Sequence, residues 1–170
     1  MADTGFELIS IALIKSTFER PIELDFLEEE VPTTTSLKAS FHQTEDPEPT
    51  VNVTLTVGVT IPTTNADEPM SVSVTMLGVF NIVGVPSNEV VNNFGNINGP
   101  AILYPFIRES IASLTMKADV PPVLLPTMNF AAAYNQSQLV KKVENSKTVK
   151  TTTKREALPS SKSRIKPAKE

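Results

Sequence analysis

The sequence predicts an α+β fold in which four antiparallel strands precede two helices. Three observations carry this prediction. Residues 51–61 alternate apolar with polar side chains or glycine, residues 70–76 repeat the alternation after a polar turn, and apolar residues from Leu103 onward recur every three or four positions. A period of two is typical of a strand with one buried face, whereas steps of three and four are typical of a helix.

The two alternating runs are predicted to form the central hairpin. Between them, residues 62–69 are polar and begin and end with proline, which favours a turn. Two alternating strands joined by such a turn pair antiparallel. Near Gly78 the alternation shifts phase, which predicts a β-bulge or a close approach of backbone at that glycine.

Two further strands are predicted upstream. Residues 6–19 carry apolar side chains on both sides, so we expect both faces of this strand to be covered: Ile9, Ile11 and Leu13 on one side, and Leu8, Ala12 and Ile14 on the other. A shorter strand is predicted where Leu37, Ala39 and Phe41 alternate with polar residues. Between these strands, residues 20–35 contain two prolines and an acidic run, which predicts a long crossover connection.

The helical part is predicted after residue 100. Leu103, Ile107, Ile111 and Leu114 form an apolar stripe, with Pro105 expected in the first turn, where a helix tolerates it. Another face of this helix carries small residues that permit close packing, namely Ala112, Ser113 and Thr115. The helix is expected to end at residues 119–122, and a second helix is expected from about residue 129, with Phe130 and Tyr134 one turn apart.

Charge divides the chain into two parts. Residues 1–134 hold 16 acidic and 5 basic residues, a net charge of −11, whereas residues 135–170 hold 10 basic and 3 acidic residues, a net charge of +7. We therefore expect a folded domain over residues 1–140 and a basic tail over residues 141–170, disordered from about residue 145 because it has little apolar surface to bury. An acidic partner that binds the basic tail stays an alternative. Against nucleic acid as that partner, the tail has no aromatic residue for base stacking and the acidic body would repel a polyanion.

The catalytic inventory favours a protein that is not an enzyme. The chain has no cysteine and a single histidine, His42, which excludes thiolate chemistry and a two-histidine metal site. No glycine-rich phosphate loop or nucleophile elbow is present. We therefore expect no cofactor and no metal. The apolar runs are only a few residues long, so we expect no membrane insertion. No basic residue precedes an apolar stretch at the N-terminus, so we expect no signal peptide and a cytoplasmic location.

Four motifs, in order, resemble the SecB family of protein-export chaperones. They are the Phe-Glu-x-Pro stretch Phe18–Pro21, the strand end Gly78–Gly84 (GVFNIVG), the helix opening Ala101–Ile111 (AILYPFIRESI), and the proline-rich connection Pro121–Phe130 (PPVLLPTMNF). The resemblance covers about residues 6–135. It implies a four-stranded antiparallel sheet backed by helices, assembled as a homotetramer that is a dimer of dimers.

The resemblance also implies a function. Members of the family hold unfolded preproteins in apolar grooves without ATP and pass them to the translocase motor SecA. Carried over by position, the client groove would comprise Leu37, Ala39, Phe41, Leu125, Phe130 and Tyr134. For Leu37 and Phe130, a place in the ordinary core is an equal alternative. The oligomer contact would use Ile107, Ile111 and Leu114. The resemblance also implies acidic positions that bind SecA. One of them is Glu19 in this chain, whereas two others are occupied by Lys15 and Ser73, which are not acidic.

Three functions stay open at this point. The first is a general holdase for preproteins. The second is an adaptor of the same fold that serves one client, such as a toxin–antitoxin pair. The third is a nucleic-acid-associated protein that acts through the basic tail.

Overall fold

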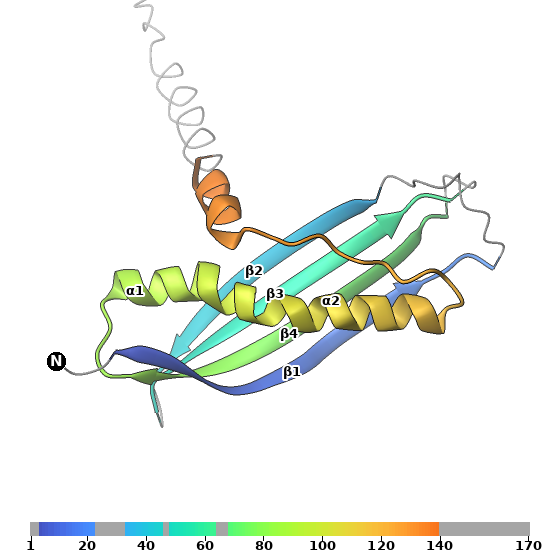
Figure 1. The fold of residues 1–170 in the computed structure, drawn as a ribbon. Helices are drawn as coiled ribbons and strands as arrows, with labels where there is room; N and C mark the ends of the chain where they lie inside the picture. Colours follow the sequence, from blue (N-terminus) through green and yellow to red (C-terminus); the bar gives the residue numbers. More distant parts are fainter. Residues whose placement is uncertain (1–3, 23–32, 46–47, 64–67, 140–170) are drawn as a thin grey trace, which may run out of the picture. The chain divides into compact units, whose positions relative to one another are not determined.

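The computed structural model describes residues 4–22, 33–45, 48–63 and 68–139. The chain divides into two compact units, residues 1–131 and residues 132–170. The first unit contains one antiparallel sheet with strand order β1-β4-β3-β2, built from β1 (Gly5–Glu19), β4 (Met70–Val83), β3 (Thr50–Ile61) and β2 (Thr34–Thr44) (Figure 1). The predicted four-stranded antiparallel sheet with helices is confirmed.

The central strands β3 and β4 alternate as the sequence predicts. Their inward side chains are buried at every second position, from Val51 to Ile61 and from Met70 to Ile82. The predicted phase shift near Gly78 is wrong, because burial alternates without interruption along β4. The predicted close approach is correct: a Cβ at Gly78 would lie 2.8 Å from Cε2 of Phe80 and 2.9 Å from Cδ2 of Leu103.

Strands β1 and β2 form the two edges of the sheet, and the crossover connection is expected between them. Residues 23–32 of that crossover lie outside the described part of the chain. Along β1 the pairing with β4 shifts twice, between Leu8 and Ser10 and between Leu13 and Lys15. Each shift adds one residue to β1, as a β-bulge does. The cover expected on both faces of this strand is incomplete among the described residues: Ile11 packs against the core, whereas Leu8, Ile9, Leu13 and Ile14 are exposed.

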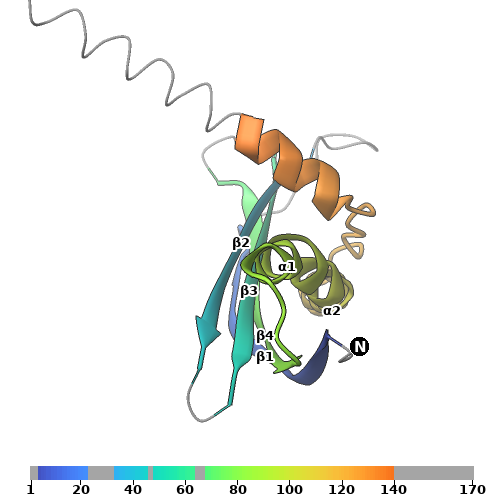
Figure 2. The same cartoon turned by 90° about the vertical axis from the view of Figure 1, so that its left-hand side faces the viewer.

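The helical layer lies on one face of the sheet (Figure 2). It begins at α1 (Asn88–Asn93), continues through the π-helix η1 (Phe94–Asn98) and ends with α2 (Gly99–Lys117). The expected start near Leu103 is therefore wrong. Ser87 caps the helical segment, accepting a hydrogen bond from the Val90 N–H at 3.4 Å. Pro105 consequently lies inside α2, whereas the sequence predicts it in the first turn.

Two glycines explain why the Asn- and Gly-rich segment is helical. A Cβ at Gly95 would overlap the ring of Phe41, and a Cβ at Gly99 would lie 2.6 Å from Cγ2 of Val53. Glycine therefore lets the helical segment approach β2 and β3 closely. Packing against the sheet outweighs the weak helix propensity of asparagine and glycine.

Helix α2 ends at the predicted place, and the segment that follows runs back along it. The Val123 N–H donates to Oγ1 of Thr115 at 3.1 Å, and the Tyr104 hydroxyl donates to the carbonyl oxygen of Pro126 at 2.7 Å. Thr115 is fully buried, and the connection rather than a second helix packs against it. We call residues 120–129 the connection.

Residues 130–139 are helical, which confirms the predicted second helix. The basic tail predicted over residues 141–170, and its predicted disorder, lie outside the described residues. Among the described residues, no helix is long and apolar enough to span a membrane.

Candidate functional site

The predicted groove residues of β2 lie along one side of an edge strand. Leu37, Ala39 and Phe41 are paired with Val57, Leu55 and Val53 of β3, respectively. Residues directly opposite each other in an antiparallel pair share a face of the sheet, and these three partners are fully buried. Leu37, Ala39 and Phe41, which we call the β2 strip, therefore lie on the side of the sheet that faces the helical layer.

The β2 strip is only partly covered. Leu37 and Phe41 are half-buried and pack against the core, whereas Ala39 is exposed. The cover comes from η1, which contacts β2 and β3 and places Gly95 over the Phe41 ring. The strip thus combines an anchored aromatic ring with neighbouring apolar surface at the edge of the sheet.

Two other predicted groove residues lie in the core of the first unit. Leu125 and Phe130 are almost completely buried. The Phe130 ring packs edge-on against Tyr104, with ring centroids 5.5 Å apart. Burial raises the pKa of Tyr104, and the positive charge of Arg108 opposes that shift. Tyr104 therefore stays protonated and donates its hydrogen bond to Pro126.

The remaining groove residue, Tyr134, belongs to the second unit. Its carbonyl oxygen accepts a hydrogen bond from Oγ of Ser137 at 2.7 Å, within helix 130–139. The structure thus brings together Leu37, Ala39 and Phe41 on one strand, and Leu125 and Phe130 in the core.

The residues expected at the oligomer contact fall into two groups. Ile107 and Ile111 are fully buried within the single chain, in the core between α2 and the sheet. Leu114 is half-buried and, with Leu13 of β1, lines a hollow of about 140 Å³. Of these three residues, only Leu114 has side-chain surface left for another molecule.

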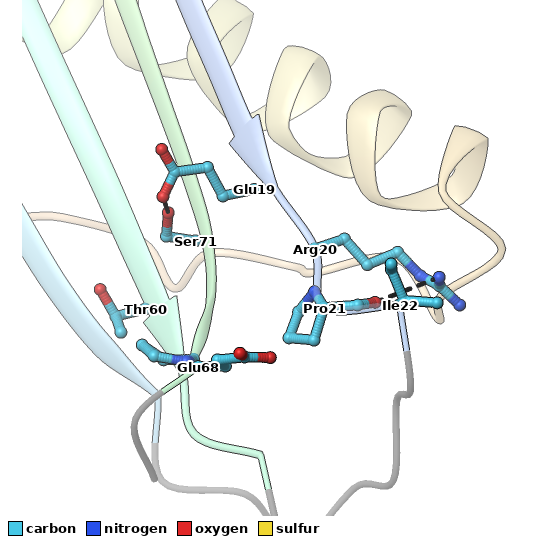
Figure 3. Close-up of a pocket in the computed structure, with 8 residues that line it drawn as sticks. Glu19, Arg20, Pro21, Ile22, Thr60, Glu68 and Ser71 are labelled. Atoms are coloured by element: carbon cyan, nitrogen blue, oxygen red, sulfur yellow. Dashed lines mark hydrogen bonds between the residues drawn. The ribbon is translucent and has the colours of Figure 1, made fainter. Parts of the chain in front are cut away.

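Glu19 lines a larger hollow at the end of β1 (Figure 3). The hollow measures about 490 Å³ and is also bordered by Thr60 and Glu68. Oγ of Ser71 donates to Oε2 of Glu19 at 3.3 Å. The guanidinium of Arg20 instead donates to the carbonyl oxygen of Pro21, at 3.3 Å. The predicted docking residue is therefore an exposed carboxylate at the rim of a hollow with both polar and apolar lining.

The described residues provide no cluster of three His, Cys, Asp or Glu side chains that could hold a metal ion. His42, the one histidine of the chain, is exposed on β2 and paired with Asn52 of β3. Oδ1 of Asn52 is buried and has no hydrogen-bond partner in the structure. Sequence reasoning did not single out Asn52, since burial of a single amide oxygen has no signature in the sequence pattern.

The exposed aliphatic side chains of β1 were also missed as a surface. Leu8, Ile9, Leu13 and Ile14 are between 47% and 57% exposed. Their signal in the sequence is a Leu-Ile pair that recurs after five residues. Strict alternation makes neighbouring residues point to opposite sides, so this pattern predicts a strand covered on both faces. The two register shifts break that alternation.

Comparison with known proteins identifies related chains. The protein-export protein SecB of Neisseria meningitidis is 37% identical over 87 residues, which are 51% of this chain and 58% of that protein. The match therefore spans little more than half the length of that relative. SecB of Nitrosomonas europaea is 35% identical over 114 residues, which cover 66% of this chain and 70% of that protein.

A solved structure has a similar fold. The Mycobacterium tuberculosis Rv1957 SecB-like chaperone, in complex with a ChAD peptide from the Rv1956 HigA1 antitoxin, aligns with a TM-score of 0.55 and 18% identity, over 72% of this chain and 90% of that one. The family described as preprotein translocase subunit SecB matches residues 3–141. A match over that much of the sequence, on a four-stranded antiparallel sheet of the same kind, shows that this chain belongs to the SecB family.

Proposed function

We propose that this chain is an ATP-independent holdase, which binds unfolded preproteins and keeps them competent for export. The observation that carries the proposal is the partly covered β2 strip in a chain whose SecB family match spans residues 3–141. The strip offers apolar surface beside an edge strand whose second side pairs with no described strand. An extended, unfolded segment is the kind of ligand that fits such an edge.

The driving force for client binding is the burial of apolar surface. Each Å² of apolar surface removed from water contributes about 25 cal/mol, so a client segment with several aliphatic or aromatic side chains gains affinity without any specific sequence. Folded proteins hide such segments, which makes the surface selective for non-native chains. Leu125, Phe130 and Tyr134 remain part of the proposed groove, with Leu125 and Phe130 supporting it from the core.

The proposed assembly is a homotetramer, a dimer of dimers. Exposed Leu8, Ile9, Leu13 and Ile14 and half-buried Leu114 support self-association, because a soluble monomer seldom leaves so many large aliphatic side chains together in water. We propose residues 1–140 as the chaperone domain, with residues 141–170 as a basic extension.

Glu19 is the residue proposed to dock the downstream receptor. It is exposed at the rim of a hollow, where a partner can reach its carboxylate. Lys15 and Ser73, which occupy two positions that are acidic in relatives acting with SecA, weaken the charge complementarity to that motor. Binding of the client is therefore the better supported half of the proposal, and delivery to SecA is the weaker half.

A second candidate function is service to a single client. It is favoured by the similarity in fold to the SecB-like chaperone Rv1957, whose structure contains a peptide from an antitoxin. A dedicated adaptor would use the same edge strand but hold one partner in stoichiometric amounts.

The proposal is tested by aggregation of a chemically denatured client in the absence of nucleotide. The wild-type chain should suppress light scattering. Ala39→Asp, which places a charge in the exposed part of the β2 strip, should weaken client binding about tenfold, a cost of roughly 1.4 kcal/mol. Ser40→Asp is the matched control, because Ser40 is the next residue on the other face of the strand and is equally exposed.

The outcome separates the candidates. Loss of suppression in Ala39→Asp with retention in Ser40→Asp supports capture by the β2 strip, and no suppression by the wild-type chain would reject the holdase. Capture of many unfolded preproteins from lysate favours the general chaperone, whereas one stoichiometric partner favours the adaptor.

A further inference from the structure

The face of the sheet opposite the helical layer, which we call the outer face, has an uneven distribution of charge. In the first unit, the helices pack on the other face (Figure 2). The paired residues of the outer face lie in rows that cross all four strands, and the residues of one row share this face because they lie directly opposite one another. Counted along β2, the rows begin at Thr34, Ser36, Lys38, Ser40, His42 and Thr44.

The positive charges lie in the middle of the outer face. Lys38 of β2 pairs with Thr56 of β3. Thr56 pairs in turn with Thr75 of β4, which pairs with Lys15 of β1. Both lysine side chains are exposed, and three strand spacings separate them by about 14 Å across the sheet. One row, which we call the lysine row, therefore has a lysine at each end and two threonines between them.

The carboxylates in the rows of the outer face lie near its two ends. Glu19 is two rows from Lys15 in one direction, and Glu7 is three rows from it in the other. With two residues of strand between rows, these distances are about 13 Å and about 20 Å. Both exceed the Debye length of about 8 Å at physiological salt. The lysine row is therefore a local positive surface on a body that is acidic as a whole.

The surface between the two lysines is low and rich in hydroxyl groups. Oγ1 of Thr56 lies 2.9 Å from Oγ1 of Thr75, and their hydrogen bond uses one of the two hydroxyl hydrogens. In the next row, Gly58 has no side chain, and a Cβ there would lie 2.7 Å from Oγ of Ser36 and 3.9 Å from Oγ of Ser73. These small side chains leave room for another chain to lie across the sheet, and their hydroxyls can donate to it.

We propose that the lysine row binds an extended acidic segment of a partner protein. Lys15 and Lys38 each bind one carboxylate, and the threonine hydroxyls between them donate to a third. An extended chain rises about 3.3 Å per residue, so four residues span about 13 Å, close to the separation of the lysines. Residues i, i+2 and i+4 of such a chain point to the same side. The segment that fits therefore has acidic residues at alternate positions.

Nucleic acid fits the outer face less well than a short acidic peptide. Residues 1–134 have a net charge of −11, which repels a long polyanion, whereas two or three carboxylates contact the lysine row alone. The paired residues of the outer face also include no Phe, Tyr or Trp for base stacking. The lysine row is on the opposite face from the β2 strip, so this inference does not depend on client capture. It is also independent of the docking proposed for Glu19.

A fluorescent reporter on the outer face tests the proposal. The chain has no cysteine, so Ser40→Cys in the full chain takes a single environment-sensitive dye. Ser40 is exposed in the row next to Lys38, and the dye therefore reports binding at this face and not at the basic tail. The peptide Glu-Thr-Glu-Thr-Glu should bind about fivefold more tightly than Thr-Glu-Glu-Glu-Thr, which has the same composition but cannot reach both lysines. Lys-Thr-Lys-Thr-Lys should not bind.

Substitution of the lysines gives the second readout, in the same labelled chain. Lys15→Gln and Lys38→Gln should each weaken binding of Glu-Thr-Glu-Thr-Glu about three- to fivefold at low salt, because each removes one exposed ion pair. Lys117→Gln is the matched control, since Lys117 is an exposed lysine at the end of α2, and its affinity should stay within about twofold of the parent. Lys15→Glu/Lys38→Glu should reverse the preference and bind Lys-Thr-Lys-Thr-Lys instead.

Each outcome decides for or against the lysine row. No dye response to the acidic peptides would overturn the proposal, as would equal binding by the parent, Lys15→Gln and Lys38→Gln. A single-stranded oligothymidine that binds more tightly than Glu-Thr-Glu-Thr-Glu, and is weakened by the same substitutions, would overturn a peptide as the partner. The aggregation assay measures client capture separately, so failure of the proposed holdase would leave these results unaffected.

Discussion

The two edge strands of the sheet occupy equivalent places but present different surfaces. β2 keeps an unbroken register with β3 from Thr34 to Thr44, and its larger apolar side chains are half-buried. β1 shifts register twice against β4 and leaves four large aliphatic side chains about half exposed. The same topology therefore provides one edge with a small anchored strip and another with a broad apolar surface.

This difference indicates two kinds of partner. The surface of β1 is a group of exposed aliphatic side chains, which suits the proposed self-association. The apolar side chains of β2 are an aromatic anchor and two smaller neighbours. This surface suits an extended segment of variable sequence. The helical layer supports both edge strands. Substitutions in and near this layer therefore test whether the functions proposed for β1 and β2 can be separated.

The largest effect is expected from Ile111→Asp, which removes the support common to both edges. Ile111 is 0% exposed in the core between α2 and the sheet. A buried, unpaired carboxylate there should cost about 3–5 kcal/mol and unfold much of the protein. Thermal unfolding followed by circular dichroism measures it. Met116→Asp is the matched control on the exposed side of α2 and should change stability by about 0.5 kcal/mol or less. A stable Ile111→Asp variant would contradict the helix assignment.

The second effect should separate the two edges. Gly95→Ala places a Cβ against the Phe41 ring and should force Phe41 and η1 apart. Overpacking should cost about 1–3 kcal/mol, of which the better helix propensity of alanine offsets about 1 kcal/mol. Client capture should fall, while the proposed self-association should not change. Gly5→Ala, which meets nothing within 4 Å, is the control. Equal loss of oligomer and client binding in Gly95→Ala would show that the edges are coupled.

Sequence reasoning succeeded where local pattern and tertiary environment agree. The alternation of residues 51–61 predicts β3 because each apolar residue there is buried, and the spacing of Ile107 and Ile111 predicts α2 because both face the sheet. It failed at residues 88–98, where asparagine and glycine favour a loop. Close packing of Gly95 on Phe41 decides that segment, and a contact between residues so far apart has no local signature.

The candidate site was predictable to a similar extent. Periodicity identifies Leu37, Phe41 and Ile111 as apolar positions on a face, but it does not tell a face covered by the same chain from one left for a partner. The register shifts of β1 were equally hidden, because an added residue in one strand is defined by the strand beside it.

A smaller effect is expected from Tyr104→Phe, which leaves both edges in place. The variant loses the hydrogen bond to Pro126 and should cost about 1 kcal/mol. Burial raises the pKa of Tyr104 above its ordinary value of 10.0, so the unfolded chain releases the phenolic proton first as the pH rises. The contribution of Tyr104 is therefore fully present below about pH 10 and is lost above it.

Denaturant unfolding at pH 8 and at pH 11 measures this difference. The stability gap between the wild type and Tyr104→Phe should be larger at pH 8 and should narrow at pH 11. A gap that widens at pH 11 would contradict the direction of the pKa shift. Client capture at pH 8 should match the wild type, because phenylalanine at position 104 keeps the aromatic ring that packs against Phe130 of the proposed groove.

The smallest effect should be a gain in stability at the end of α2. Asp119 has φ 59°, its N–H donates to Met116, and the Val120 N–H donates to Thr115, which together form a Schellman motif with Asp119 in the glycine position. The carboxylate also lies at the negative end of the helix dipole. Asp119→Gly removes the side-chain strain and the charge, so it should stabilise the fold by about 0.5–1 kcal/mol.

Asp119→Asn separates those two causes, because asparagine tolerates the left-handed conformation but carries no charge. Its stability should lie between those of the wild type and Asp119→Gly, measured by thermal unfolding. A destabilised Asp119→Gly would indicate that the carboxylate makes a favourable interaction in the assembled protein. Unchanged client capture and self-association in both variants would show that the end of α2 takes part in neither activity.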